Sequence, residues 1–203
     1  MSIDDNPIAI AVTGASGSAY ALRLIECLIR AGETLYLMIS QAGRVVLKME
    51  SDLVLPAQPA EMEKILSQRF DARPGQLQVF ARQQWMAPVA SGSNPPRAMV
   101  VCPCTTGTLS AIACGASNDL MERAADVVLK ERRKLILVVR ETPFSDIHLE
   151  NMLKLSRMGV VIMPANPGFY HNPQGVQDII DFMVSRILDQ LGIENRLLPR
   201  WGG

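Results

Sequence analysis

The chain has 203 residues, with 20 Lys plus Arg against 20 Asp plus Glu, and 48% of its residues are hydrophobic. A chain of this length is expected to form one domain, residues 1–203, whose core needs neither disulfides nor a metal ion. The formal net charge of zero disfavours duplex nucleic acid and anionic membrane surfaces as partners.

Targeting signals and metal-binding patterns are both missing from the sequence. No apolar run approaches the roughly 18 residues of a membrane span, and the N-terminus lacks the basic start of a secretion signal. We therefore expect a soluble, cytoplasmic protein. The four cysteines form no CxxC pair and are expected to be reduced, with Cys102 and Cys104 on the same face of one strand. With only two histidines, in separate segments, no metal site is expected.

Short apolar runs alternate with longer segments of helical period, which indicates an α/β fold. We expect a three-layer, Rossmann-like arrangement, with helices on both faces of a mostly parallel sheet. In chain order the expected elements are strand 8–12, helix 18–31, strand 35–39, helices 42–51 and 59–69, strand 98–101, helices 106–114 and 118–132, strand 135–139, helix 146–158, strand 160–163 and helix 175–191. Residues 56–96 are expected to be an irregular excursion carrying Trp85, an apolar side chain that a ligand or a second subunit would cover.

Small residues follow the first expected strand. Gly14, Ala15 and Ser16 open the first helix, where free N–H groups and the helix dipole favour a phosphate or a flavin. The GxGxxG fingerprint of dinucleotide folds is absent, because Ser16 and Ala19 stand where it needs glycines. Ser40 ends the second strand where such folds place an acidic ribose ligand, so the loop suits a mononucleotide better. The alternative is an ordinary strand-to-helix turn.

Two later strands also end in polar loops. The residues concerned are Thr105, Thr106, Gly107, Thr108, Arg140 and Glu141. Ligands of open α/β sheets bind beyond the carboxyl ends of the strands, so we expect these residues to lie beside the first loop. A run of threonine N-caps is the alternative for residues 105–108.

Several expected helices place charge on their apolar faces. Arg186 falls on the apolar stripe of the last helix, Arg123 and Lys130 are seven residues apart on another, and Glu50 lies among apolar neighbours. Buried charges need partners, and three converging cations would bind an anion such as phosphate, to which Tyr170 could also donate. The alternatives are ion pairs within or between subunits and, for Tyr170, packing on the core.

Five segments together resemble the UbiX-type flavin prenyltransferases. They are TGASG from residue 13, PCTTGTLSAIACG from 103, ERAADVVLKERRKLILVVRETP from 122, GFYH from 168 and PRW from 199. The resemblance implies a flavodoxin-like homo-oligomer, typically a dodecamer with active sites at subunit interfaces. Such an enzyme transfers a dimethylallyl group from dimethylallyl monophosphate to N5 and C6 of reduced FMN. The product, prenylated FMN, serves UbiD-type decarboxylases in ubiquinone biosynthesis or aromatic acid decarboxylation.

The resemblance also implies roles for individual residues. FMN binding falls on Gly14, Ala15, Ser16, Ser40, Thr105, Thr106, Gly107, Thr108 and Arg140. Binding of the prenyl phosphate falls on Trp85, Arg123, Lys130, Tyr170 and Arg186. Catalytic positions match Ser16, Glu50, Lys130, Glu141 and Trp201, and no metal is required. We expect Trp201, close to the terminus, to insert into a neighbouring subunit.

Other functions remain as alternatives. Residues 103–108 also resemble the PASANT block of FMN-dependent cysteine decarboxylases, but Gly107 replaces its Asn, and neither His148 nor His171 lies near the helix that carries the catalytic histidine there. A flavin-binding module without chemistry would leave the cations on apolar faces without an anion. Direct decarboxylation of an aromatic acid would need a general acid above the bound ring.

Overall fold

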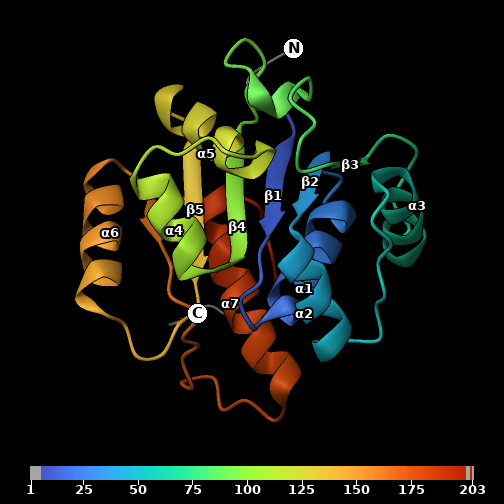
Figure 1. Cartoon of the computed structure of the whole chain (residues 1–203). Helices are drawn as coiled ribbons and strands as arrows, with labels where there is room; N and C mark the ends of the chain where they lie inside the picture. The colour runs from blue at the N-terminus through green and yellow to red at the C-terminus, as the bar shows by residue number, and fades with distance from the viewer. Residues whose placement is uncertain (1–5, 200–201, 203) are drawn as a thin grey trace.

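The computed structural model describes residues 6–199 and 202, and its helices and strands form three layers (Figure 1). The strands are β1 (Ile8–Val12), β2 (Leu35–Ile39), β3 (Leu77–Phe80), β4 (Ala98–Cys104), β5 (Lys134–Val139) and β6 (Val161–Ile162). The helices are α1 (Ser18–Arg30), α2 (Gln41–Glu50), α3 (Pro59–Phe70), α4 (Thr106–Ala113), α5 (Leu120–Lys130), α6 (Asp146–Arg157) and α7 (Val176–Leu191), with a 3-10 turn, η2, at Pro88–Ala90.

All strand pairs are parallel, in the order β3-β2-β1-β4-β5-β6. The central strands are apolar at almost every position because helices cover both sheet faces. Ile8 and Ile10 of β1 pack with α1 and α7 on one face, whereas Ala9 and Ala11 pack with α4 and α5 on the other. The expected three-layer α/β fold is confirmed.

Strand β3, at the edge of the sheet, was not predicted from the sequence. β3 lies inside the segment expected to be irregular, has only four residues and pairs only with β2. A short edge strand flanked by prolines and glycines leaves little periodic signal. Without β3 the strand order is that of flavodoxins, so β3 extends that arrangement by one strand.

The expectation that Cys102 and Cys104 share a face was wrong. Cys102 packs in the core cluster with α1 and α7, whereas Cys104 packs on the opposite side with α4 and α5. The pairing of β4 with β5 shifts register between Val101 and Cys104, which breaks the alternation of side chains. All four cysteines are free thiols. Burial raises the pKa of the Cys102 and Cys104 thiols, which keeps both uncharged at neutral pH.

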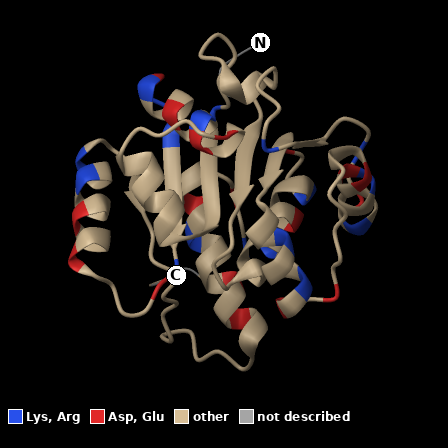
Figure 2. Cartoon of the chain, viewed as in Figure 1, with Lys and Arg blue, Asp and Glu red and all other residues tan. Residues whose placement is uncertain are grey.

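Charged side chains lie mainly on the helices, and the strands carry almost none (Figure 2). No helix among residues 6–199 is long and apolar enough to cross a membrane. In the same part of the chain, no three His, Cys, Asp or Glu side chains are grouped so that they could hold a metal ion.

Candidate active site

The carboxyl ends of the central strands bring the polar loops together, as expected. The backbone N–H of Ser40 donates to Val12 O at 3.0 Å, that of Thr13 to Pro103 O at 3.3 Å, and that of Arg140 to Cys104 O at 3.1 Å. These bonds join the ends of β1, β2, β4 and β5. The loops containing Gly14–Ser16, Ser40, Thr105–Thr108 and Arg140 therefore form one edge of the molecule.

Two of the expected ligand residues cap helices at this edge. Ser40 Oγ accepts from the N–H of Gly43 at 2.9 Å, and Thr105 Oγ1 accepts from the N–H of Thr108 at 3.1 Å. The alternative of a threonine N-cap is thus correct for Thr105. The next residues, Thr106 and Gly107, open α4, where the first backbone N–H groups of a helix have no acceptor within it. The positive end of α4 therefore remains available to an anion.

Arg140 supplies a cation beside the same helix end. Its Nε is buried and has no hydrogen-bond partner among the described residues. A buried donor without a partner is costly, so this guanidinium suits a position against a bound anion. The donors at this edge, hydroxyls, backbone N–H groups and one arginine, fit the phosphate of a mononucleotide such as FMN.

Glu50 lies at the N-terminus of α1 as a carboxylate acceptor. Its Oε2 accepts from the backbone N–H groups of Gly17 at 3.0 Å and Ser18 at 2.8 Å. Burial alone would raise the pKa of the Glu50 carboxyl, but the Ser16 hydroxyl and these two N–H groups together hold it below its ordinary value of 4.5. Glu50 and Ser16, both expected to be catalytic, are therefore hydrogen-bonded, and Glu50 is ionised at neutral pH.

Replacing Glu50 by Gln is expected to lower Tm by about 1–4 °C at pH 7, because the charge at the helix N-terminus is lost while an amide oxygen remains. A carboxyl with a lowered pKa contributes stability above its ordinary pKa of 4.5 and loses it as the pH falls through the lowered value. The difference in Tm between wild type and Glu50→Gln should thus shrink between about pH 6 and pH 3 in thermal melts. Glu150→Gln on exposed α6 is the control, and a pH-independent difference would contradict the assignment.

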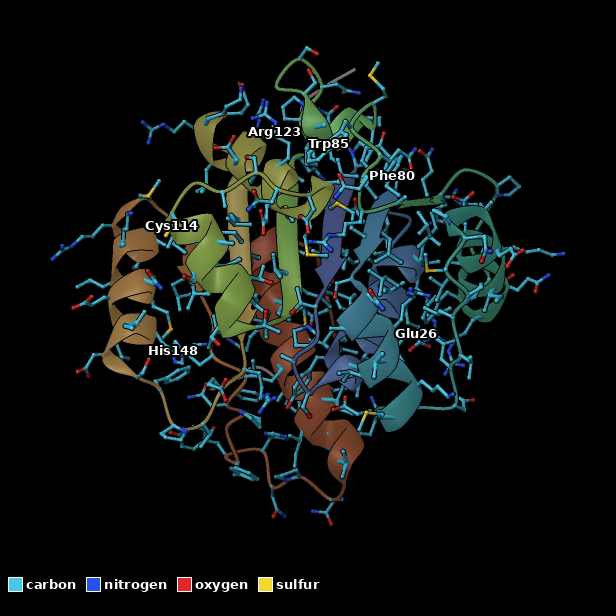
Figure 3. The ribbon with its side chains drawn as sticks, in the orientation of Figure 1. Glu26, Phe80, Trp85, Cys114, Arg123 and His148 are labelled. Atoms are coloured by element: carbon cyan, nitrogen blue, oxygen red, sulfur yellow. The ribbon has the colours of Figure 1, made fainter. Side chains whose placement is uncertain are left out.

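Trp85, Arg123 and Lys130 lie at the other end of the sheet. Lys130 ends α5 four residues before β5 begins, and Arg123 Nε donates to Ala90 O at 3.1 Å, in the segment that precedes β4. Figure 3 shows Trp85 and Arg123 at this amino end, whereas His148, at the start of α6, lies toward the opposite end. The single chain does not bring these three residues to the loops of the carboxyl edge.

The expectation of buried cations was wrong for the single chain. The side chains of Arg123, Lys130 and Arg186 are 33%, 45% and 53% exposed. Each pairs with a nearby carboxylate: Arg123 with Asp126 at 2.7 Å, Lys130 with Glu131 at 2.5 Å and Arg186 with Asp189 at 2.7 Å. The periodicity placed them on apolar stripes, but their long side chains reach the surface at the rim of each stripe. The alternative of ion pairing within the chain is correct for all three.

Tyr170 and Arg186 do lie together. They line a cavity of about 670 Å³ beside α7, with His171, Phe182 and the tail residues Leu198 and Pro199. The ring of His171 stacks on Phe182, with centroids 5.5 Å apart and planes 10° apart. Trp201, expected to be catalytic and to insert into a neighbouring subunit, lies outside the described residues.

Sequence reasoning missed the partners of the proposed ligand residues. Asp126 and Asp189 each lie three residues after the arginine that they bind, a spacing that would have indicated an ion pair on a helix. Thr13 directly follows the buried strand β1, a position from which a threonine hydroxyl can join neighbouring loops.

Comparison with known proteins gives the family. The Flavoprotein family model matches residues 2–188. A flavin prenyltransferase UbiX from Pseudomonas aeruginosa is 58% identical over 195 residues, which cover 96% of this chain and 93% of the relative. The chain belongs to the UbiX family of flavin prenyltransferases.

Solved structures of UbiX relatives have the same fold. A UbiX (PadA1) in complex with FMN and dimethylallyl pyrophosphate superposes with a TM-score of 0.86 at 37% identity, covering 98% of each chain. A dodecameric FMN-dependent UbiX-like decarboxylase from Escherichia coli O157:H7 superposes with a TM-score of 0.86 at 36% identity, covering 97% of this chain and 100% of the other. The expected membership of the UbiX family and the flavodoxin-like fold are both confirmed.

Proposed function

We propose that this protein transfers a dimethylallyl group from dimethylallyl monophosphate to N5 and C6 of reduced FMN. The observation that carries the proposal is the convergence of three polar strand-to-helix loops and the unpartnered Arg140 Nε at the carboxyl edge. The donors at that edge suit FMN, and membership of the UbiX family supports prenyl transfer as the reaction. The UbiX (PadA1) relative was solved with FMN and dimethylallyl pyrophosphate, so a flavin and a prenyl ester of phosphate are both compatible with this fold.

The FMN phosphate is held by Arg140 and the first turn of α4. Thr106 and Gly107 supply backbone N–H groups there, and Thr108 supplies a hydroxyl. Gly14, Ala15 and Ser16 form the loop beside the flavin, with Ser40 on the neighbouring loop. Reduced FMN supplies the nucleophilic N5 and the ring carbon C6.

The prenyl phosphate is held by cations and a phenol. Arg186 and Tyr170 line one cavity, and Arg123 and Lys130 lie seven residues apart on α5. These groups stabilise the negative charge that accumulates on the phosphate as its bond to the allylic carbon breaks. Trp85 places an aromatic face against the developing allyl cation and keeps water from it, and Trp201, outside the described residues, is the second aromatic residue that the family resemblance implies.

The proton released from C6 during ring closure needs an acceptor. Ser16 is hydrogen-bonded to the Glu50 carboxylate, so a proton that reaches the Ser16 hydroxyl can pass to Glu50. Glu141, next to Arg140 at the end of β5, is a second carboxylate at the same edge. These residues hold the proton, and no metal takes part.

Two subunits complete each active site. Within one chain, the loops that hold FMN lie at the carboxyl edge, whereas Trp85, Arg123 and Lys130 lie at the amino end. A homo-oligomer in which the amino end of one copy faces the carboxyl edge of another brings both sets together. The dodecameric relative from Escherichia coli O157:H7 is consistent with such an assembly. UbiD-type decarboxylases are the recipients of the prenylated FMN.

The test is to incubate the protein anaerobically with reduced FMN and dimethylallyl monophosphate and to weigh the extracted flavin. We expect one added five-carbon unit per flavin. A parallel reaction with the diphosphate identifies the preferred donor. Recovery of unmodified FMN, together with release of CO2 from a cysteinyl peptide, would instead support the cysteine decarboxylase alternative.

A further inference from the structure

Thr13 lies between two of the loops at the carboxyl edge, and its hydroxyl both donates and accepts a hydrogen bond. Only 3% of the residue is exposed. Thr13 Oγ1 donates to Pro103 O at 2.6 Å and accepts from the backbone N–H of Thr105 at 2.9 Å. Thr13 directly follows β1, whereas Pro103 and Thr105 belong to the end of β4 and the cap of α4. One buried hydroxyl thus joins the loop after β1 to the loop after β4.

The backbone of Thr13 is packed just as closely against α2. A Cβ on Gly43 would lie 2.7 Å from Val12 O and 3.2 Å from Thr13 O, so only glycine lets the first turn of α2 approach this far. A Cβ on Gly14 would lie 2.5 Å from Ala42 Cβ, on the same turn. The third loop, which begins at Ser40, is therefore seated directly on Thr13 and its neighbours.

We infer that Thr13 is a positioning residue for FMN. Its side chain fixes the distance between the loops at Gly14–Ser16 and Thr105–Thr108, and its backbone supports the loop at Ser40. Thr13 is buried beneath these loops, so it acts through them. The inference rests on the proposed function, because it assumes that these loops hold FMN.

The test is Thr13→Val, which keeps the shape of the side chain and removes both hydrogen bonds. The N–H of Thr105 then loses its acceptor, and the loop after β4 is free to shift against the loop after β1. We expect the Kd for FMN, measured by fluorescence quenching, and the KM for reduced FMN to rise about tenfold. The KM for dimethylallyl monophosphate should not change, because Arg186 and Lys130 lie elsewhere.

Two further variants separate positioning from general stability. Thr13→Ser keeps the hydroxyl and should bind FMN like the wild type. Ile8→Val removes a buried methylene at the other end of the same strand and should lower Tm without changing FMN affinity. If Thr13→Val does not fold, Thr13→Cys, with a weak S–H donor, should give an intermediate Kd.

The outcomes distinguish this inference from the proposed function. A wild-type protein that fails to bind FMN would overturn the proposed function itself. If the wild type binds FMN and Thr13→Val binds it equally well, Thr13 has no positioning role. A Thr13→Ser variant as weak as Thr13→Val would also overturn the inference, because the hydroxyl would then be irrelevant.

Discussion

Arg186→Leu is expected to reduce turnover with dimethylallyl monophosphate at least about a hundredfold while leaving FMN binding intact. Arg186 lines the cavity beside α7 and is half exposed, so leucine fits at this position without burying a new apolar surface. Asp189 keeps a partner in the amide of Asn195, which donates to it at 3.2 Å. The substitution removes a cation that lies beside the phosphate in the proposed site and stabilises the phosphate as it leaves.

The measurements for this variant are FMN affinity, oligomer size and prenylated-flavin yield. Gln177→Leu, on the same helix but outside the cavity, is the matched control and should behave like the wild type. Arg186→Lys should recover part of the activity, since it keeps the charge and loses the planar fork. Full activity in Arg186→Leu would show that this arginine serves only its ion pair with Asp189.

Two inactive variants should restore activity to each other when they assemble together. Lys130→Ala removes a cation at the amino end, and Arg140→Leu removes the phosphate donor at the carboxyl edge. If each site takes these residues from different subunits, a mixed oligomer contains sites in which both are wild type. With equal amounts and random assembly, we expect about one quarter of the wild-type activity, whereas each variant alone is inactive.

Co-expression with two affinity tags isolates the mixed oligomers for assay. The control places both substitutions in one chain and co-expresses it with the wild type. A shared site then retains about one quarter of the activity, whereas a site built within one chain retains about one half. No recovery in the mixture of single variants would mean that Lys130 and Arg140 act from the same subunit, contrary to the proposed division of the site.

Most strands, and the helices that cover the sheet, could be predicted because the spacing of apolar residues along each segment reflects which positions are buried. β1 and β5 are nearly continuous apolar runs, and their carboxyl ends carry the polar loops. Since parallel strands end at one edge, the sequence also predicted the meeting of Ser16, Ser40 and Arg140. β3 escaped prediction because its partner, β2, lies some forty residues earlier in the chain, and nothing local specifies that pairing.

The position of the cations could not be predicted from helical periodicity. The spacing of Arg123, Lys130 and Arg186 predicts that they lie on buried helix faces. Spacing locates only the Cα of a residue, however, and the charged end of a long side chain can still reach the surface. Periodicity also says nothing of which end of the sheet a helix terminus reaches. The distance between Lys130 and Arg140 follows from the topology, because α5 returns the chain to the amino end before β5 begins.

If the proposed site is correct, the ion pairs of Arg123, Lys130 and Arg186 also determine how the phosphate enters and leaves it. Arg123, Lys130 and Arg186 each pair with a carboxylate one or three residues away, so a phosphate must compete with that carboxylate for the cation. In the proposed site, an entering phosphate displaces Asp126, Glu131 or Asp189 from its cation, so it binds a cation that was already paired. After transfer, the same carboxylates compete with inorganic phosphate for the cations, and their return helps to expel it before the next substrate arrives.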